Sequence, residues 1–458
     1  MKMATTLMFS RTLHYGIGGA IAAVLSTGAA AQWNPSQGDW GKDDPAHVRV
    51  MTWNVKDAIC TTNTKQEAIN AWTGCAVIIA SMKPDILILQ ETGDNVGNGT
   101  GFGQDSVSSL AVAAELLIHG GNDPVLGGTV GSYVQKYDPS FDLPHIFVSS
   151  SSDGFNRNII MSRWPFADLN GDGRTTMSDI PFVAGVDYAA GGDGGIRGFQ
   201  FVEIDLPNDV YAGDLVMGGA HLKAGGSGSD VIQRREAAQN VAYFIDHFYN
   251  GAGTGMPDPD NAISDNPPAM TVLGPNTPVI IGGDWNEDEL TNGNKGPAEW
   301  LTRAQLTGGA DGTDRDGSDA MFDSAVDPLT GSRGTFGNSS KLDYLGWQDS
   351  VASLAHAWVF NTASVNSQTA PPEILSFPGF AGSLSGAASD HRPVIADFEL
   401  ATVSPCPGDL DGDGVVDGAD LASLLASWNG SGSADLNGDG VVDGADLAAM
   451  LAAWGDCA

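Results

Sequence analysis

Basic residues are scarce in this chain. It has 21 Lys and Arg against 56 Asp and Glu among 458 residues, so its formal net charge is −35. A protein that holds nucleic acid by charge alone needs a basic surface, and this composition excludes that class. Phosphate chemistry is compatible with the composition only where metal ions or a local basic cleft supply positive charge.

Cysteine is also rare, with four residues in the whole chain. Four cysteines allow three disulfide connectivities, and their positions favour two local pairs, Cys60 with Cys75 and Cys406 with Cys457. Such pairs predict an oxidising destination. Structural zinc is the weaker interpretation, because no CxxC motif or nearby pair of histidines accompanies the cysteines.

The chain beyond its N-terminus lacks an apolar run of about 18 residues, the length that a membrane-spanning helix needs. We therefore expect no membrane span in the mature protein. The N-terminus itself predicts an export signal: Lys2 and Arg11 are basic, residues 17–25 are apolar, and residues 29–31 are small, as at a cleavage site. Residues 1–31 are expected to be a signal peptide, and the protein is expected to be secreted, either extracellular or associated with the cell surface.

What the chain does contain is an alternation of β-rich runs and helical periods over residues 48–400. The expected helices cover residues 64–82 and 229–249. The expected strands cover residues 48–55, 85–91, 155–162, 197–206, 215–223, 278–286 and 392–400. This alternation predicts an α/β domain, which a polar linker at residues 32–47 is expected to precede.

The composition changes abruptly after Leu400. Residues 401–458 hold ten Asp and no Lys, Arg or Glu. The segment that begins at Asp409 recurs from Asp435, 26 residues later. This internal repeat predicts a separate module at residues 409–458, joined to the larger domain by a linker at residues 401–408.

Each repeat has the spacing of a calcium-binding loop. Calcium binds oxygen ligands at alternating positions of a tight loop that has Gly at its sixth position. A solvated acidic tail is the alternative, but randomly placed Asp residues would not repeat in register. The expected Ca²⁺ ligands are Asp409, Asp411, Asp413, Asp417 and Asp420 in the first loop and Asp435, Asn437, Asp439, Asp443 and Asp446 in the second.

A third loop inside the larger domain, at residues 168–179, has the same spacing. It lacks a partner repeat, so an acidic turn remains the alternative to calcium binding. Its expected Ca²⁺ ligands are Asp168, Asn170, Asp172, Thr176 and Asp179.

The paired C-terminal loops resemble dockerin type I modules over residues 409–458. The resemblance implies a small all-α module of paired EF-hand-type calcium loops, with a cohesin-like or cell-surface partner. Two recognition positions that are often Ser or Thr in dockerins are Gly418 and Ala419 in the first repeat, and Gly444 and Ala445 in the second.

In the larger domain, polar residues stand at the ends of the expected strands. Acidic and amide oxygens together with two histidines suit metal-assisted cleavage of a phosphodiester, in which the metal neutralises the phosphate and a base activates water. For any one of these residues a cap or turn role is the alternative. The strand-end residues are Asn54, Glu91, His221, Asp284, Asn286, Asp390 and His391.

These residues stand in the motifs TWN, LILQE, GGAHLK, IIGGDWN and SDHRPV, joined by SKLDYL. In this order, across residues 48–400, the motifs resemble the endonuclease/exonuclease/phosphatase superfamily, which includes deoxyribonuclease I, abasic-site endonucleases, sphingomyelinases and inositol polyphosphate phosphatases. The resemblance implies a four-layer α/β sandwich, in which two packed mixed β-sheets are flanked by helices and the site lies at one rim.

The resemblance also implies roles at the metal. Asn54 and Glu91 are expected to hold Mg²⁺ or Mn²⁺. Asp284 is expected to orient or activate the attacking water, with Asn286 beside it. Asp390 is expected to assist at the metal.

Further roles concern the substrate phosphate. The resemblance implies that His391 contacts the scissile phosphate as acid or base, that Asp343 pairs with this histidine, and that His221 is a second histidine facing the phosphate. Arg157 and Arg197 are expected to bind the substrate. For Arg197 a structural salt bridge is the alternative.

The His221 and His391 pair resembles deoxyribonuclease I, secreted nucleases and sphingomyelinases. We therefore expect a secreted metal-dependent phosphodiester hydrolase, most simply a nuclease acting on nucleic acid. One alternative is a phosphodiesterase or phosphatase acting on a small or lipid phosphoester. Two others are a polysaccharide-degrading enzyme that uses Glu91 and Asp284 as its two carboxylates, and an inert calcium-dependent binding component.

Overall fold

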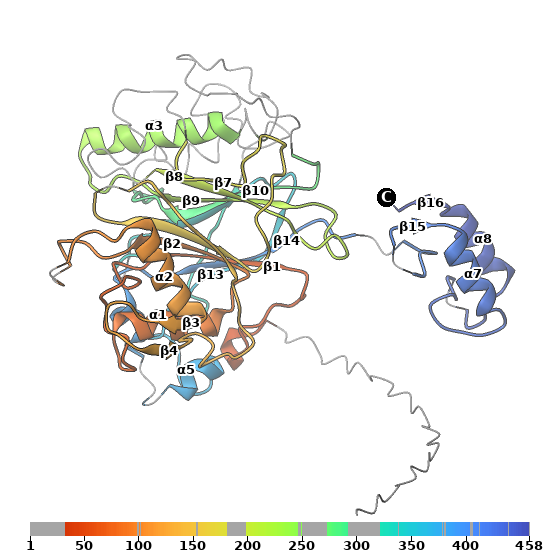
Figure 1. Ribbon diagram of the computed structural model, residues 1–458, viewed down its shortest axis with the longest axis horizontal. Coiled ribbons are helices and arrows are strands. Elements are labelled where there is room, and N and C mark those ends of the chain that lie inside the picture. Colours follow the sequence, from red (N-terminus) through yellow and green to blue (C-terminus); the bar gives the residue numbers. More distant parts are fainter. Residues whose placement is uncertain are drawn as a thin grey trace, which may run out of the picture.

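The protein forms a layered α/β domain followed by a small C-terminal module (Figure 1). The expected signal peptide and Arg197 lie outside the residues that the structure describes. The computed structural model describes residues 33–98, 100, 102–152, 154–180, 198–245, 249, 273–291, 321–337, 339–377, 379, 382–403, 406–411, 413–437 and 439–457.

The first six-stranded sheet has the order β13-β14-β1-β2-β6-β5. Strands β1 and β2 are parallel, and the other neighbours are antiparallel. Its strands are β1 (Val48–Asn54), β2 (Ile86–Thr92), β5 (His145–Val148), β6 (Arg157–Ser162), β13 (Ser353–Val359) and β14 (Val394–Glu399).

The second six-stranded sheet has the order β11-β12-β10-β9-β8-β7. Here β9 and β10 are the parallel pair, so each sheet has one parallel pair near its centre. Its strands are β7 (Thr176–Met177), β8 (Phe199–Ile204), β9 (Leu215–His221), β10 (Val279–Asp284), β11 (Met321–Phe322) and β12 (Asp343–Trp347).

Helices cover the outer face of each sheet. One core lies between the first sheet and its helices, a second between α3 and the second sheet, and a third between the two sheets. The order helix, sheet, sheet, helix confirms the four-layer sandwich. None of the described helices has the length and apolar character needed to cross a membrane. The described helices are α1 (Ala71–Met82), α2 (Val107–Ile118), α5 (Pro372–Ser376) and α6 (Leu384–Ala388) on the first sheet and α3 (Gly228–Ile245) on the second. The described part of the domain also contains a short 3-10 helix, η1 (Pro35–Gln37), and a small hairpin, β3 (Gly120–Asn122) with β4 (Thr129–Gly131).

Strand β1 shows why the central strands are apolar throughout. Val48 and Val50 belong to the core between the sheets, whereas Met51 and Trp53 belong to the core under the helices. Both faces of the strand are therefore buried, and successive residues alternate between two cores. By the same alternation Asn54, at the end of β1, faces the space between the sheets.

The seven strands expected from the sequence are all present, but the expected linker at residues 32–47 is wrong for the described residues 33–47. Trp40 is buried and its indole Nε1 donates to the carbonyl of Thr369 at 2.7 Å. The ring of Trp33 packs 4.3 Å from that of Trp358. Burying these large rings holds the segment against the first sheet's core.

One of the two expected cysteine pairs is present. Cys406 and Cys457 form a disulfide, whereas Cys60 and Cys75 are separate, buried thiols. Cys75 lies on α1 in the apolar core, and the sulfur of Cys60 lies 4.0 Å from the hydroxyl of Thr62. The prediction of a Cys60–Cys75 disulfide is therefore wrong, because proximity in sequence does not bring the two sulfurs together.

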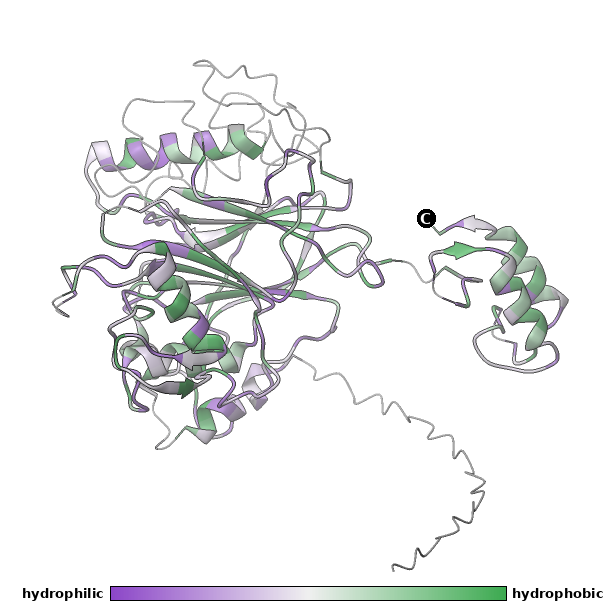
Figure 2. Ribbon diagram, viewed as in Figure 1, coloured by the Kyte–Doolittle hydropathy of each residue, from purple (hydrophilic) through white to green (hydrophobic). Residues whose placement is uncertain are grey.

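The C-terminal module has a core of its own, which includes Val416, Leu424 and Met450. Figure 2 shows hydrophobic residues along both of its helices, α7 (Gly418–Ala426) and α8 (Gly444–Ala452). The module is not all-α as expected, because β15 (Val415–Val416) pairs with β16 (Gly455–Asp456).

The expected linker at residues 401–408 is shorter than predicted. Ala212 N donates to Ala401 O at 2.9 Å and Val403 N donates to Val210 O at 3.0 Å, so residues 401–403 still belong to the larger domain. Cys406 packs against the core of the module. Residues 404–405, which lie outside the described residues, connect the two.

Candidate active site

The candidate site lies at one end of the space between the sheets. Asp284, the last residue of β10, pairs in register with His221 of β9 on one side and with Asp343 of β12 on the other. These three residues therefore lie side by side on three adjacent strands. Asn54 ends β1 in the facing sheet, in register with Gln90 of β2.

Glycines in β9 and β10 let the two sheets approach closely here. A Cβ atom on Gly282 would lie 2.8 Å from Ile88 Cδ1 of the first sheet, and one on Gly219 would lie 2.9 Å from Ile88 Cγ2. Because these side chains are absent, the amide nitrogen Nδ2 of Asn54 reaches Asp284 Oδ2 at 3.0 Å. The polar strand ends of both sheets thus meet in one cluster.

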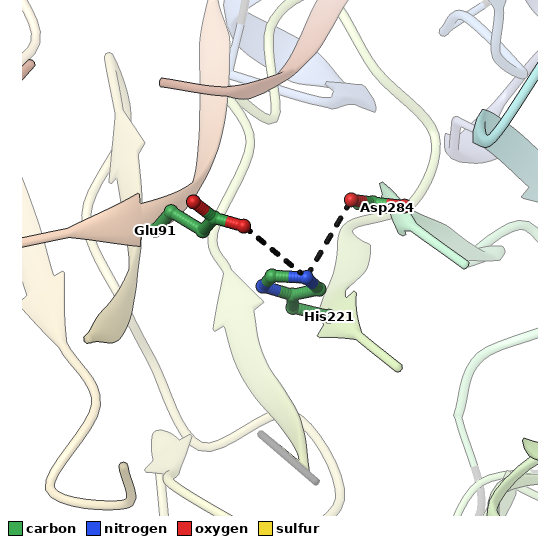
Figure 3. Close-up of side chains that lie close together, drawn as sticks. All are labelled: Glu91, His221 and Asp284. Carbon is green, nitrogen blue, oxygen red and sulfur yellow. Dashed lines mark ion pairs between the residues drawn. The ribbon is translucent and has the colours of Figure 1, made fainter. Parts of the chain in front are cut away.

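Glu91, His221 and Asp284 form the part of the cluster that can hold a metal. Figure 3 shows the three side chains pointing toward one another. His221 Nε2 lies 3.6 Å from Glu91 Oε1 and 3.5 Å from Asp284 Oδ2, and one ligand atom from each residue lies within 4.8 Å of the others. The side chain of Glu91 is 25% exposed while the other two are buried, so the cluster opens to solvent on the Glu91 side.

The backbone of Glu91 explains how its side chain reaches this cluster. Strict alternation along β2 would turn Glu91 toward the helix layer with Leu87 and Leu89. Instead Glu91 has φ +52°, and the pairing of β2 with β6 is irregular between Leu89 and Thr92. Such an irregularity redirects a side chain, and here it places the Glu91 carboxylate 3.0 Å from Asn54 Nδ2.

The donor set fits a hard divalent cation, with one condition. Carboxylate and amide oxygens are the ligands that Mg²⁺ and Mn²⁺ prefer. In the structure Asn54 directs its NH₂ group at both carboxylates, while its Oδ1 accepts from Lys56 N at 3.1 Å. An NH₂ group cannot bind a cation. Ligation by Asn54 therefore requires its amide to turn over so that the oxygen faces Glu91 and Asp284.

His391 is paired with a buried carboxylate. Its Nδ1 lies 2.8 Å from Asp343 Oδ2, and its Nε2 lies 3.7 Å from Asp284 Oδ2. Burial disfavours the charged imidazole, but Asp343 and then Asp284 outweigh it and raise the pKa of His391 to about 10. With Nδ1 held by Asp343, Nε2 of the ring faces Asp284 and the site.

Asp284 is the most central group of the cluster. Burial, and after it the charge of Asp343, raises the pKa of Asp284 to about 7, although His391 and the hydrogen bond from Asn54 act in the opposite direction. The charged form of Asp284 is therefore disfavoured mainly by the loss of solvent. A divalent cation beside Asp284 would favour that charged form.

Asn286 and Asp390 lie at the edges of the site. Asn286 has φ +54° and its Nδ2 donates to Leu222 O at 3.0 Å, which ties the segment after β10 to the segment after β9. Asp390 is partly exposed and its Oδ2 lies 2.6 Å from Lys56 Nζ. Lys56 was missed from the sequence, although a basic residue two positions after Asn54 is conspicuous in so acidic a chain.

Arg157 is not brought together with these residues. Its guanidinium donates to Ser150 O at 2.6 Å and to Asp105 O at 3.2 Å, and its other described hydrogen bonds also go to backbone carbonyls. In this structure it holds loops together, and a substrate-binding role remains a prediction.

The two C-terminal loops fold around their own carboxylates in the same way. In the first, Gly414 N donates to Asp409 Oδ2 at 2.9 Å and Leu410 N donates to Asp420 Oδ1 at 2.7 Å. The corresponding bonds recur in the second loop, to Asp435 at 2.7 Å and to Asp446 at 2.8 Å. One oxygen from each of Asp409, Asp411 and Asp413 lies within 4.8 Å of the others.

The loop at residues 168–179 begins in the same way but ends differently. Gly173 N donates to Asp168 Oδ2 at 2.9 Å, matching the first position of the other loops. Leu169 N, which corresponds to Leu410, donates to Glu203 of β8. The expected last ligand, Asp179, instead accepts from Ser151 Oγ at 3.1 Å.

At the last position of this loop, Glu203 accepts the backbone bond that Asp420 and Asp446 accept in the other two loops. Thr176 lies in β7, where it pairs with Val202 of β8. Glu203 takes the place expected for Asp179, and no local sequence signal could have identified it because it belongs to the next strand. Burial raises the pKa of Glu203 to about 7, and the nearby charges of Asp172 and Asp168 add to the shift.

No family model and no curated protein matches the chain. Solved structures to which it is similar include an endonuclease/exonuclease/phosphatase protein from Beutenbergia cavernae, with 18% identity, a TM-score of 0.41, and coverage of 78% of this chain and 72% of that one. The human Nocturnin catalytic domain with bound sulfate has 13% identity and a TM-score of 0.37, covering 78% and 95%. Beta toxin from Staphylococcus aureus has 14% identity and a TM-score of 0.37, covering 76% and 99%. At these values the likeness assigns no role to any side chain of this chain.

Proposed function

We propose that the larger domain is a metal-dependent phosphodiester hydrolase. The observation that carries this proposal is the convergence on one buried carboxylate, Asp284, of two histidines and an asparagine that also contacts Glu91. Glu91 and Asp284, with Asn54 turned over, would hold Mg²⁺ or Mn²⁺. When bound, such an ion supplies positive charge to the phosphate and lowers the pKa of water.

The side chains of this chain then have separate tasks. Asp284 lies where it can accept a proton from a water held between it and the phosphate. Nε2–H of His391, kept charged by Asp343, can donate to a phosphate oxygen or to the leaving group. His221 Nε2, close to both Glu91 and Asp284, offers a second donor.

The same geometry argues against a polysaccharide-degrading enzyme. Glycoside hydrolysis needs two carboxylates separated by about 5 Å or more, with the sugar between them. Here Glu91 Oε1 and Asp284 Oδ2 both accept from the single nitrogen Nδ2 of Asn54, each at 3.0 Å. One oxygen of Glu91 and one of Asp284 lie within 4.8 Å of each other, which is shorter than the separation of about 5–5.5 Å between the two carboxyl groups of a retaining glycosidase. The inert binding component is disfavoured by the completeness of the cluster.

Within the proposal, a secreted nuclease is the first candidate. The alternative is a phosphodiesterase or phosphatase acting on a small or lipid phosphoester. Val96 and Phe102 favour a lipid substrate, because both are apolar and well exposed in the segment that follows Glu91.

A substrate panel with each metal supplied separately tests the proposal. Single-stranded DNA, RNA, a 4-nitrophenyl phosphodiester and sphingomyelin vesicles would be assayed with Mg²⁺, Mn²⁺ or Ca²⁺, and again with EDTA. We expect metal-dependent hydrolysis of at least one phosphodiester, abolished by EDTA. A polysaccharide hydrolysed in the presence of EDTA, with every phosphodiester intact, would contradict the proposal.

We further propose that the two C-terminal loops and the loop at residues 168–179 bind Ca²⁺. The support is that all three wrap backbone N–H groups around a first-position carboxylate in the same pattern. In the third loop Glu203 would supply the last carboxylate. Without metal, the carboxylates of each loop repel one another, so Ca²⁺ should stabilise each loop.

A cohesin-like or cell-surface partner for the module remains a proposal. Its support is an exposed apolar pair at the end of each helix, Leu425 with Trp428 and Leu451 with Trp454, in which the tryptophan lies two residues beyond the helix; the pairs occupy matching positions of the repeat. Calcium-dependent binding to an immobilised cohesin, lost in a chain truncated after residue 403, tests it. Equal binding by the truncated chain would contradict it.

A further inference from the structure

An exposed aromatic ring stands beside the histidine of the proposed catalytic pair. The ring of Phe336 lies 4.9 Å from that of His391, centroid to centroid. Despite this contact Phe336 is 41% exposed. A large apolar side chain left in water next to a catalytic imidazole offers its free face to whatever is attached to the scissile phosphate.

The position of Phe336 is held by backbone hydrogen bonds. Its N–H donates to Ser340 O at 2.9 Å, and Arg392 N donates to Thr335 O at 2.7 Å. Phe336 and His391 also form an isolated antiparallel bridge. Backbone hydrogen bonds thus hold the segment of Phe336 against the segment of His391. The distance between the two rings is therefore set by the backbone.

A positively charged side chain, Lys56, lies near the same segment, residues 390–391. Lys56 Nζ pairs with Asp390 Oδ2 at 2.6 Å, and the lysine side chain is 56% exposed. Its backbone lies in a left-handed turn, with φ 43°. Asp390 directly precedes His391, and Gly337 N lies 3.4 Å from Asp390 O. The ammonium group and the aromatic ring therefore flank the same two residues, Asp390 and His391.

We infer that these two side chains form a nucleotide subsite, in which a nucleobase stacks on Phe336 and a phosphate next to the scissile one binds Lys56. The inference rests on the proposed phosphodiester hydrolase function and names its substrate class. A base can reach Phe336 only if it is unstacked and unpaired. The substrate is therefore single-stranded nucleic acid or a free nucleotide, and not a duplex.

The charge of the chain agrees with this substrate class. A duplex binder contacts many phosphates through Lys and Arg, whereas this chain has only 21 such residues and a net charge of −35. Binding that combines one cation with base stacking needs few basic residues. Base–aromatic stacking is strong enough to change affinity by about ten-fold or more for each base.

Two model substrates with the same leaving group test the role of Phe336. Thymidine 5′-(4-nitrophenyl phosphate) and methyl 4-nitrophenyl phosphate both release 4-nitrophenolate, but only the first carries a nucleoside. We expect the full-length protein with Mg²⁺ or Mn²⁺ to have a higher kcat/KM for the nucleoside ester. Phe336→Ala and Phe336→Leu should each lower this preference about ten-fold, mainly through KM, and Phe336→Tyr should retain it.

Leu375→Ala is the matched control, because Leu375 is 43% exposed on α5 and lies away from the site. Its preference should equal that of the wild type. A preference unchanged in both Phe336→Ala and Phe336→Leu would overturn the subsite while leaving the hydrolase proposal intact. Hydrolysis of neither ester, with sphingomyelin vesicles as substrate instead, would also overturn it. No phosphodiesterase activity at all would overturn both proposals.

Lys56→Gln tests the adjacent phosphate with single-stranded oligothymidylate and free dithymidine monophosphate as separate substrates. We expect kcat/KM for the oligonucleotide to fall and its dependence on salt to weaken by about one ion. Dithymidine monophosphate carries the scissile phosphate alone, so its kcat/KM should be the same in Lys56→Gln as in the wild type. An equal loss on both substrates would overturn the role of Lys56 at the adjacent phosphate. A salt dependence identical to that of the wild type would overturn the role of Lys56.

Discussion

Asn54 of β1 donates its amide hydrogen to Asp284 of β10 across 3.0 Å, and this bond joins the two sheets at the rim of the domain. The same nitrogen also donates to Glu91 at 3.0 Å. One amide thereby holds the two carboxylates that we propose as metal ligands. The site exists only while the two sheets remain this close.

The first prediction concerns the short distance between the two sheets. Gly282→Ala should destabilise the protein by about 1–3 kcal/mol, because the new Cβ would lie 2.8 Å from Ile88 Cδ1 of the facing sheet. Activity should fall as well, since Asn54 and Asp284 would be pushed apart. Urea denaturation and kcat measure the two effects. Gly131→Ala is the control, because a Cβ there meets nothing within 4 Å.

The second prediction concerns His391. His391→Ala should lower kcat by about 10²–10⁴-fold, because the protonated ring beside the phosphate is lost. Circular dichroism should match the wild type if the fold is intact. His119→Ala provides the comparison, because His119 lies at the end of α2 and contacts Glu115 and Asp142. Near-normal turnover by a folded His391→Ala protein would rule out the proposed acid.

The third prediction concerns metal affinity. Glu91→Gln replaces a partly exposed carboxylate with a neutral side chain of the same shape, so the Mg²⁺ concentration for half-maximal activity should rise. Part of the lost activity should return at high Mg²⁺, and stability should change little. Glu115→Gln, at the far end of α2, should leave the titration unchanged. A Glu91→Gln titration that overlays the wild type would show that Glu91 is not a ligand.

The fourth prediction is a count of calcium ions. Isothermal titration of the full chain with Ca²⁺, in excess Mg²⁺ to fill the proposed catalytic site, should give three Ca²⁺ ions for the wild type and two for Asp420→Ala. Glu203→Gln should also give two, because this carboxylate, and not Asp179, closes the loop at residues 168–179. Asp179→Asn is the matched control and should still bind three. A result in which Asp179→Asn loses the ion and Glu203→Gln keeps it would restore the ligand set expected from the sequence.

The fifth prediction concerns the cysteines. Burial raises the pKa of Cys60 to about 11, so only about one thiol in a thousand is ionised at pH 8. Burial also raises the pKa of Cys75. We expect iodoacetamide to leave both unmodified in the native protein and to modify both after unfolding without reductant. Mass spectrometry should find the Cys406–Cys457 peptide pair and no pair between Cys60 and Cys75.

Much of the site could be predicted from sequence because it uses strand ends. Asn54, His221 and Asp284 each follow a run of apolar residues, and such runs identify buried strands without knowledge of their neighbours. The loops proposed to bind calcium are equally local, since one turn of chain carries nearly all their carboxylates. The Cys406–Cys457 pair likewise followed from its position at the two ends of the repeat.

Contacts between segments far apart in the chain were decided only by the tertiary structure. Glu203 closes a loop that begins at Asp168, and Phe336 lies against His391, although neither pair shares a local pattern. The Asn54–Asp284 bond depends on two sheets that approach where Gly219 and Gly282 have no side chains. The sequence alone determined which residues end each strand, because alternation and loop spacing act between neighbours along the chain. Which of these ends meet was decided by packing, because the distance between two sheets depends on all the side chains that fill the space between them.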